Sequence, residues 1–222
     1  MNPCHPSTDR TRPWISVNLA VSADGKTSDV AGRPSGWTSG ADHDRLLELR
    51  ATAGALLVGR RTLVTDHMTL TCPGREIQPL RCVVAGCGEV PEAHPLFDRA
   101  GGAIHWLFTG QPPSLALRFP AEVTVHRGTL ADFLTTIKTQ LGVDHVHCEG
   151  GGTLIRMLAE MDAIDELHLT LAGHTLFGGQ EAPTPTGSPS DYLPKSLEFR
   201  VSRFEVSPET GECFMSYRRH AQ

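Results

Sequence analysis

Hydrophobic and polar residues alternate strictly near the start of the chain. From Trp14 to Ser22 every second residue is apolar, which predicts a strand with one apolar face and one small, polar face. Asn18 belongs to the polar face. That face could line a cleft or could face solvent, and the pattern alone leaves both interpretations open.

Similar patterns along the rest of the chain predict an α/β fold. The run from Ala55 to Gly59 is almost continuously apolar, as in a strand that is covered on both faces. Two final strands, at 196–206 and 212–219, flank a turn at Thr210 and Gly211 and read as a hairpin. Further strands are expected at 81–85, 103–108, 122–126, 145–149 and 164–171. Strands that alternate with helices before a hairpin indicate a mainly parallel sheet with an antiparallel edge.

Helical spacing marks the stretches between these strands. Ser39 is a good N-cap, and Asp42 three residues later completes a capping-box pattern for a helix whose core stripe is Leu46, Leu49 and Ala53. A second helix is expected at 130–141, and a third from residue 154 to 161. The ligands of such sheets bind at the carboxyl ends of the strands.

Three consecutive glycines, Gly150 to Gly152, separate a predicted strand from the third helix. Glycine lets a backbone approach a ligand closely, and the free N–H groups of a first helical turn attract anions. A phosphate of a dinucleotide would fit such a turn. The alternative is a tight strand-to-helix turn that holds no ligand, and the spacing matches neither the G-x-G-x-x-G motif nor a P-loop.

Several arginines are candidates for binding anionic groups. Arg60 and Arg61 follow a strand end, where two guanidinium groups and the hydroxyl of Thr62 suit a phosphate, although they could equally be solvated surface residues. Arg50 stands beside the apolar stripe of its helix and could extend to water or reach an anionic substrate. Because they follow strand ends, Thr62, Asp66 and the three glycines can share one cleft.

Composition narrows the class of protein. The chain has 222 residues and a net charge of −5, which argues against a dedicated nucleic-acid binder and offers no cationic face for a membrane. No apolar run is long enough to span a bilayer. Six scattered cysteines show no disulfide or zinc spacing, so we expect reduced thiols in a cytoplasmic protein. Residues 1–12 resemble a flexible leader, and residues 13–222 a single domain.

Three polar side chains of one strand could suggest other chemistry. His145, His147 and Glu149 alternate onto one face, but no fourth ligand follows at a recognisable spacing, and we expect no metal site. The H-x-E pair also matches half of the zinc deaminase signature, whose P-C-x-x-C half is absent from the sequence. No known context for a Cys–His nucleophile surrounds any cysteine.

Five motifs in the same order resemble the reductase of riboflavin biosynthesis, which is the C-terminal half of a bacterial bifunctional deaminase-reductase and a stand-alone protein in archaea. The resemblance extends from about residue 12 to residue 217. The motifs are NLAVSADGK (18–26), LRATAGALLVGRRT (49–62), Asp66 with Leu70-Thr71, EGGGTL (149–154) and FGGQEAPTPTG (177–187). Bacterial bifunctional enzymes carry Lys where this chain has Asn18, and archaeal reductases carry Asn.

The resemblance implies a dihydrofolate-reductase-like fold with helices on both faces of the sheet, a homodimer and the cofactor NADPH. It implies a reductase domain without a deaminase domain. The substrate would be a phosphorylated pyrimidine, either 5-amino-6-(5-phosphoribosylamino)uracil or its 2,5-diamino-pyrimidinone equivalent, whose ribosyl group is reduced to ribityl. Hydride would pass from the nicotinamide to carbon C1 of the sugar through the ring-opened imine.

The resemblance also assigns roles to residues. The substrate would contact Asn18, Ser35, Arg50, Leu70 and Glu149. The cofactor would contact Val21, Trp37, Arg60, Arg61, Thr62, Asp66, Gly150, Gly151, Gly152, Thr153 and Leu154. Asp66 and Glu149 are the candidate acids, and Arg75 could replace a basic residue that relatives carry after the Leu-Thr pair. Two alternatives remain open: a reductase of the same fold with a secondary-metabolite substrate, and a nucleotide-binding protein without activity.

Overall fold

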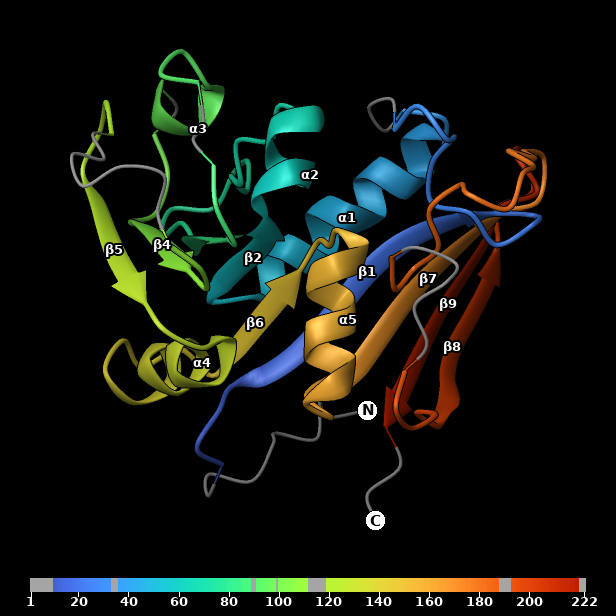
Figure 1. Ribbon diagram of the computed structural model, residues 1–222. Coiled ribbons are helices and arrows are strands. Elements are labelled where there is room, and N and C mark those ends of the chain that lie inside the picture. The colour runs from blue at the N-terminus through green and yellow to red at the C-terminus, as the bar shows by residue number, and fades with distance from the viewer. Residues whose placement is uncertain are drawn as a thin grey trace.

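The computed structural model describes residues 10–32, 36–88, 91–98, 100–111, 119–187 and 193–219. They form one nine-stranded sheet in the order β5-β4-β3-β2-β6-β1-β7-β9-β8, which Figure 1 shows from one side to the other. The strands are β1 (Trp14–Ser22), β2 (Ala55–Gly59), β3 (Leu80–Ala85), β4 (Ile104–Phe108), β5 (Val123–Arg127), β6 (His145–Cys148), β7 (Glu166–Ala172), β8 (Phe199–Val206) and β9 (Cys213–Arg219).

The predicted fold class is confirmed. All pairings from β5 across to β7 are parallel, whereas β9 pairs with β7 and β8 in antiparallel orientation. The strand predicted at Trp14–Ser22 has those bounds, and the other strands begin or end within a few residues of the expected positions. The C-terminal hairpin therefore extends one edge of a parallel sheet.

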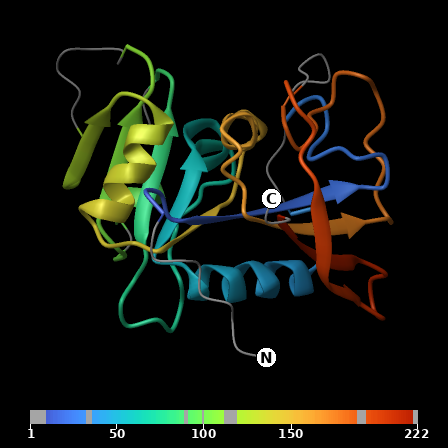
Figure 2. The ribbon, with the colours of Figure 1, turned by 90° about the horizontal axis from the view of Figure 1, so that it is seen from below.

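Helices cover both faces of the sheet (Figure 2). On one face, α4 (Leu130–Thr139) and α5 (Gly152–Glu160) pack on the apolar side chains of the central strands. On the other face, α2 (Arg60–Thr65) and α3 (Pro95–Asp98) cover β2, β3 and β4. The helix α1 (Gly40–Thr52) lies on this second face too, below β1 and β6.

The part of the sheet that faces α1 is polar. Buried Ser16, His147 and His168 lie here, and Arg45 of α1 donates to the carbonyl oxygens of Leu169 at 3.2 Å and Met215 at 2.8 Å. Of the core stripe that we predicted for this helix, the two leucines are only half buried, whereas Ala53, at the C-cap, is fully buried. Arg50 is the one buried side chain within α1 itself. A sheet face built from serine and histidine gives a helix polar partners in place of an apolar core.

The N-terminus of α1 is capped as predicted, but the capping box is incomplete. Ser39 accepts a hydrogen bond from the Asp42 amide at 3.3 Å. The carboxylate of Asp42 accepts from Thr170 instead of turning back to Ser39, whose own N–H donates to buried Glu212 at 2.9 Å. A glutamate from the C-terminal hairpin therefore supplies the reciprocal bond.

Two short helices were not predicted. In α2 three of the six residues are β-branched and no side chain caps the first turn, so the sequence carries no helical signal. The four residues of α3 are too few to show a period.

Arg10 and Arg12, which we placed in the flexible leader, both pair with Asp165, at 2.6 and 2.5 Å. Among the described residues, no helix has the length and apolar character that crossing a membrane requires.

Candidate active site

The glycine turn lies where the sequence predicted it, between β6 and α5. Gly59 at the end of β2 donates its N–H to the carbonyl oxygen of Gly150 at 2.7 Å. The Gly150–Gly151 peptide is cis. The end of β2 and the glycine turn are thus joined at the carboxyl edge of the sheet, where α/β proteins bind their ligands.

Two of the three glycines are needed because other parts of the protein approach them closely. A Cβ on Gly151 would come within 2.4 Å of the Thr62 hydroxyl oxygen. A Cβ on Gly152 would come within 2.6 Å of the backbone nitrogen of Gly187. The predicted proximity of Thr62 to the glycines is therefore confirmed, and the segment around Gly187 joins them.

The first turn of α5 has the properties of an anion-binding site. Gly151 occupies the N-cap position and supplies no side-chain hydrogen bond, and the first turn carries no acidic residue. Thr153 in this turn is exposed. Backbone N–H groups and the positive end of the helix dipole suit a phosphate, so these residues fit the diphosphate of a dinucleotide.

Arg60 and Arg61 lie next to this edge, at the start of α2. The guanidinium group of Arg60 is so close to Gly88, after β3, that a Cβ there would come within 2.8 Å of its Cζ. Arg61 is exposed. The cofactor role of Arg60 and Arg61 stays a prediction.

The predicted substrate residues Arg50 and Glu149 bind each other. Nε of Arg50 donates to Oε1 of Glu149 at 2.7 Å, and Nη2 donates to Oε2 at 2.6 Å. The two side chains are only 9% and 2% exposed. Burial disfavours the charged form of Arg50, but the adjacent carboxylate outweighs it and raises its pKa above the ordinary value. The pair is therefore a buried bidentate salt bridge between α1 and the end of β6.

This salt bridge changes the expectation for Arg50. We expected its guanidinium group to reach the cleft, and the structure directs it to Glu149 and to the Thr71 carbonyl oxygen, at 3.1 Å. Leu70, next to Thr71, is fully buried with φ +53°, a conformation that costs a non-glycine residue free energy. Arg50 thus orders the Leu-Thr segment, and contact with a substrate stays a prediction for both residues.

Arg75 has a structural partner. Its guanidinium group donates to the carbonyl oxygens of Ala53 and Arg50, the latter at 3.4 Å. These carbonyls end α1, where a cation complements the helix dipole. Arg75 therefore stabilises the helix that carries Arg50.

The other predicted site residues lie in several elements or outside the described part of the chain. Val21 is buried near the end of β1, and Trp37 packs edge-to-face on Phe177 with 5.0 Å between ring centres. Asp66 is the C-cap of α2. Leu154 is buried in α5. Ser35 lies outside the described residues.

The polar face of β1 contains Asn18 beside Glu149, according to the register in which Val17 pairs with Cys148. Asn18 is half buried, and its Oδ1 atom is buried without a hydrogen-bond partner. The three side chains that could suggest a metal have partners in the protein: His145 and His147 contact Ser16, and Glu149 binds Arg50. At Ser16 this face of β1 is fully buried, so there it does not face solvent.

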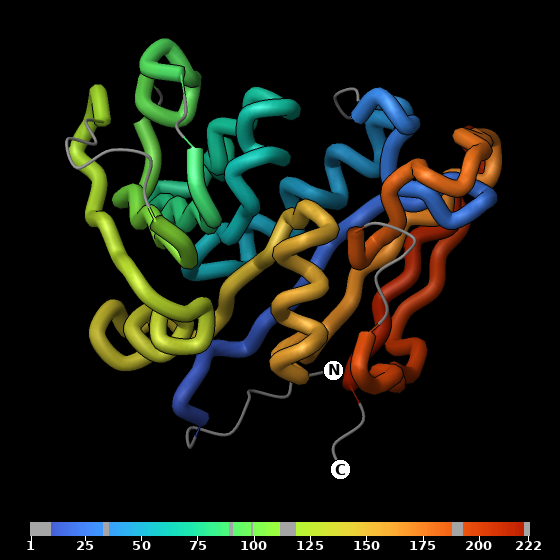
Figure 3. The backbone as a smooth tube through the Cα atoms, viewed as in Figure 1, coloured from blue at the N-terminus to red at the C-terminus, as the bar shows by residue number. Residues whose placement is uncertain are grey.

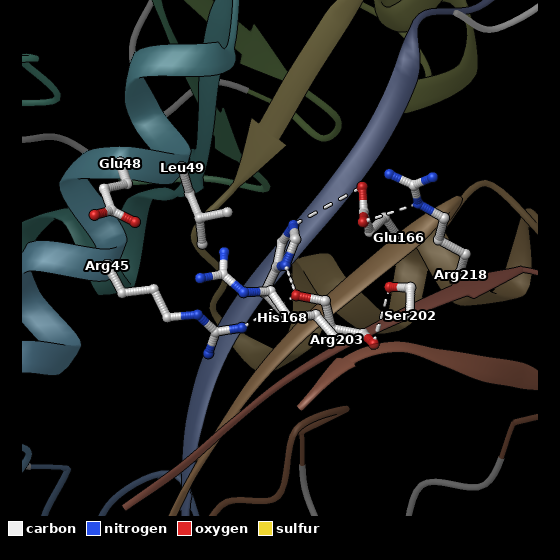
Figure 4. A pocket seen from close by; sticks show the side chains of 9 residues that line it. Arg45, Glu48, Leu49, Glu166, His168, Ser202, Arg203 and Arg218 are labelled. Atoms are coloured by element: carbon white, nitrogen blue, oxygen red, sulfur yellow. Dashed lines mark hydrogen bonds and ion pairs between the residues drawn. The ribbon is translucent and has the colours of Figure 1, made fainter. Parts of the chain in front are cut away.

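Sequence reasoning missed two features near the site. The segment after β7 lies beside the one after β1 (Figure 3), where Ala23 donates to Thr175 and Thr27 to Pro183, both at 2.9 Å. A cavity of about 330 Å³ lies between α1 and β7, β8 and β9 (Figure 4). Its lining includes Arg45, His168 and Arg203 but none of the predicted ligand residues. Both features depend on contacts between distant segments, for which a single sequence carries no signal.

Comparison with known proteins identifies relatives of two lengths. A sequence model of the RibD C-terminal domain matches residues 13–207. The 2,5-diamino-6-ribosylamino-4(3H)-pyrimidinone 5′-phosphate reductase of Archaeoglobus fulgidus is 31% identical over 189 residues, which are 78% of this chain and 85% of the relative. The riboflavin biosynthesis protein RibD of Bacillus amyloliquefaciens is 31% identical over 183 residues, with 78% of this chain and 48% of the relative covered. The chain thus spans about half the length of that bacterial relative.

Solved structures share the fold. RibD of Acinetobacter baumannii superposes with a TM-score of 0.77 at 20% identity over 95% of this chain and 59% of that one. The riboflavin biosynthesis reductase Rib7 of Saccharomyces cerevisiae superposes with a TM-score of 0.68 at 15% identity over 97% and 93% of the two chains. These likenesses extend the agreement from sequence motifs to the arrangement of the whole sheet.

Proposed function

The chain belongs to the RibD C-terminal domain family, and we propose that it is an NADPH-dependent reductase of riboflavin biosynthesis. Its substrate would be a 5-phosphoribosylamino-pyrimidine, whose ribosyl group it reduces to ribityl. The relative from Archaeoglobus fulgidus, named for this type of reaction, supports the substrate class. The observation that carries the proposal is the shared carboxyl edge of β1, β2 and β6, which brings together the glycine turn, Thr62 and the Arg50–Glu149 pair.

The edge of the sheet supports the choice of cofactor. The uncapped first turn of α5 would hold the diphosphate, with the Thr62 hydroxyl beside it. Arg60 and Arg61 would contact the additional phosphate that distinguishes NADPH from NADH, because guanidinium groups bind phosphate with charge-assisted hydrogen bonds. When bound, NADPH supplies the hydride, and the protein supplies orientation and excludes water.

The chain's own residues would organise the substrate beside that cofactor. Asn18 and Glu149 each follow one member of the Val17–Cys148 pair, and Arg50 fixes the carboxylate of Glu149 by two hydrogen bonds. The buried pair would hold the wall of the substrate cleft in one geometry. A fixed geometry raises the fraction of bound complexes in which hydride can reach the sugar carbon.

We also propose that the enzyme is a homodimer. Strand β8 forms one edge of the sheet, and Val201, Phe204 and Val206 on one of its faces are 59%, 58% and 52% exposed. Such an apolar row on an open edge favours association with a second copy. Sedimentation should give a dimer that Phe204→Asp converts to a monomer, whereas Arg200→Asp on the opposite face leaves it intact. A monomeric native protein at micromolar concentration would refute this assembly.

Two further expectations accompany the proposal. Residues 13–222 would form a single reductase domain that works in the cytoplasm. Cys82 and Cys148 are free and fully buried, and burial raises the pKa of each thiol to about 12, so both stay protonated and inert. Such thiols suit a reducing compartment.

Turnover on the phosphorylated pyrimidine tests the proposal. NADPH oxidation should follow addition of either the uracil or the diamino-pyrimidinone compound, and the faster of the two identifies the substrate. NADPH binding without oxidation on either compound would favour a protein that acts on another substrate or that has no activity. A ribitylamino product, identified by mass spectrometry, completes the test.

A further inference from the structure

The segment that follows β7, residues 173–187, forms a strap along the carboxyl edge of the sheet (Figure 3). Its carbonyl oxygens accept hydrogen bonds from the N–H groups of Ala23 and Thr27, just after β1, each at 2.9 Å. Its last residue, Gly187, lies so close to Gly152 that a Cβ on Gly152 would come within 2.6 Å of the Gly187 nitrogen. The strap therefore connects the end of β1 with the glycine turn, where we place the cofactor diphosphate.

Asp24 fastens the middle of the strap. Its Oδ2 atom accepts from the N–H of Gly178 at 2.7 Å, and its Oδ1 atom accepts from the N–H of Phe177 at 3.3 Å and from the hydroxyl of buried Ser22 at 2.5 Å. Consecutive backbone N–H groups are a favourable site for an anion. The Ser22 hydroxyl lowers the pKa of Asp24 most, desolvation acts against it, and the two N–H groups lower the pKa further. Asp24 is therefore a charged acceptor at neutral pH.

The turn that carries Asp24 is ordered by its own hydrogen bonds. Ser22 donates its N–H to the carbonyl oxygen of Lys26 at 2.9 Å and accepts from the N–H of Gly25 at 2.9 Å. The Ser22 hydroxyl also accepts from the N–H of Lys26 at 3.0 Å. Gly25 has a φ of +73°, which residues with a Cβ rarely adopt. The carboxylate of Asp24 is therefore presented to the strap in one orientation.

Phe177 transmits this fastening to a second aromatic ring. It packs edge-to-face on Trp37, with 5.0 Å between the ring centres and an angle of 86° between the ring planes. Both side chains are half buried. Two residues after Trp37, the N–H of Ser39 donates to buried Glu212 at 2.9 Å. Trp37 therefore lies between two fixed points, and the resemblance places it in the cofactor site.

We propose that Asp24 is a positioning residue for hydride transfer: it fixes the strap so that Phe177 holds the Trp37 ring as a wall for the nicotinamide of the bound cofactor. This proposal rests on the proposed function. The ends of β6 and β7 are two strand spacings apart, roughly 10 Å, because only β1 lies between them. A dinucleotide with its diphosphate at the glycine turn can therefore place its nicotinamide, one ribose away, beside the strap.

Positioning and mere fastening have different consequences. Asp24 exchanges no proton or electron, so its effect on turnover comes only from the placement of the rings. A misplacement of about 1 Å can slow a reaction roughly a hundredfold. The affinity for the cofactor, by contrast, would come mainly from its phosphates at the glycine turn and the arginines. Loss of Asp24 should therefore slow hydride transfer and change NADPH affinity little, whereas a merely structural residue would affect stability alone.

NMR of tryptophan side chains tests the fastening without any substrate. The chain has three tryptophans, and Trp37→Phe identifies the indole N–H signal of Trp37. Asp24→Asn, which turns an amide NH2 towards the strap, should shift this signal as Phe177→Leu does. Asp132→Asn is the matched control, because Asp132 is also exposed and accepts from a hydroxyl, that of Thr129 at 2.6 Å in α4. A Trp37 signal that Asp24→Asn leaves unchanged, or that NADPH does not shift in the native protein, would overturn the proposal.

Single-turnover kinetics test the role in hydride transfer. Asp24→Asn should slow NADPH oxidation by about ten- to a hundredfold, with an NADPH affinity close to that of the native protein and of Asp132→Asn. In a Phe177→Leu background the same substitution should add little, because Asp24 acts through Phe177. An unchanged rate, or losses that simply add, would overturn the positioning role. If the native protein reduces no pyrimidine, the proposed function fails, and the NMR experiment still decides whether Asp24 sets the Trp37 ring beside the cofactor.

Discussion

Replacing Arg50 by alanine should destabilise the protein by about 3–5 kcal/mol, because the Glu149 carboxylate would stay buried without its counter-charge. Glu149 is 2% exposed and receives two hydrogen bonds from Arg50. For a chain of 222 residues, each kcal/mol lowers Tm by about 2–4 °C, so the loss corresponds to roughly 6–20 °C. The surface pair Arg156–Glu160, which is 24% and 39% exposed, should contribute only about 0.3–0.5 kcal/mol.

A double-mutant cycle separates the pair from its surroundings. Urea unfolding of Arg50→Ala, Glu149→Ala and the double variant should give a double loss clearly smaller than the sum of the two single losses. The same cycle on Arg156 and Glu160 is the matched control. Additive losses at Arg50 and Glu149, or single losses no larger than those of the surface pair, would refute the inference that this salt bridge organises the site.

Three further predictions concern the glycine turn, the cofactor and the hairpin. Thr153→Asp should weaken NADPH binding, measured by fluorescence, because a carboxylate at the start of α5 repels phosphate although it suits the helix dipole. The control variant Thr153→Asn should bind NADPH as the native protein does. Equal NADPH affinities of the two variants would contradict the phosphate site. Replacing both Arg60 and Arg61 by alanine should lower the ratio of NADPH affinity to NADH affinity by about ten- to a hundredfold, measured in paired titrations. An unchanged ratio would show that these arginines do not select NADPH. Burial raises the pKa of Glu212, but hydrogen bonds from Ser39 and His174 outweigh it and lower the pKa overall, so the stability that the carboxylate contributes is present at neutral pH and lost in acid. Urea unfolding at pH 7 should therefore show Glu212→Gln to be less stable than the native protein by about 1.5–3 kcal/mol. This difference in unfolding free energy should become smaller in acid, as the native carboxylate is protonated. A difference that is the same at both pH values would contradict the lowered pKa of Glu212.

The parts of the fold that the sequence predicted are those set by local periodicity. The alternation from Trp14 to Ser22 gives β1 its bounds, and the glycines before α5 mark the strand-to-helix turn. The Ser39 cap is equally local. By contrast, α2 shows no hydrophobic period over its six residues, so only its packing in the folded protein reveals it.

The arrangement within the site depended on distant contacts that no periodicity encodes. Arg50 and Glu149 are 99 positions apart, and each looked like an independent ligand residue until the fold paired them. His145 and His147 suggested a metal face, but Ser16 from another strand links them into a column. The sequence therefore predicted that Thr62 and the glycine turn meet, and it could not predict that Arg50 and Glu149 bind each other.

Transfer of deuterium from NADPH carrying the label at nicotinamide C4 tests the central claim most directly. With the phosphorylated pyrimidine as substrate, the ribitylamino product should contain one deuterium, located at sugar carbon C1 by NMR. The phosphate-free substrate serves as the comparison for recognition of the phosphate group. A product without deuterium at C1, or no reduction of either pyrimidine while NADPH binds, would contradict the account.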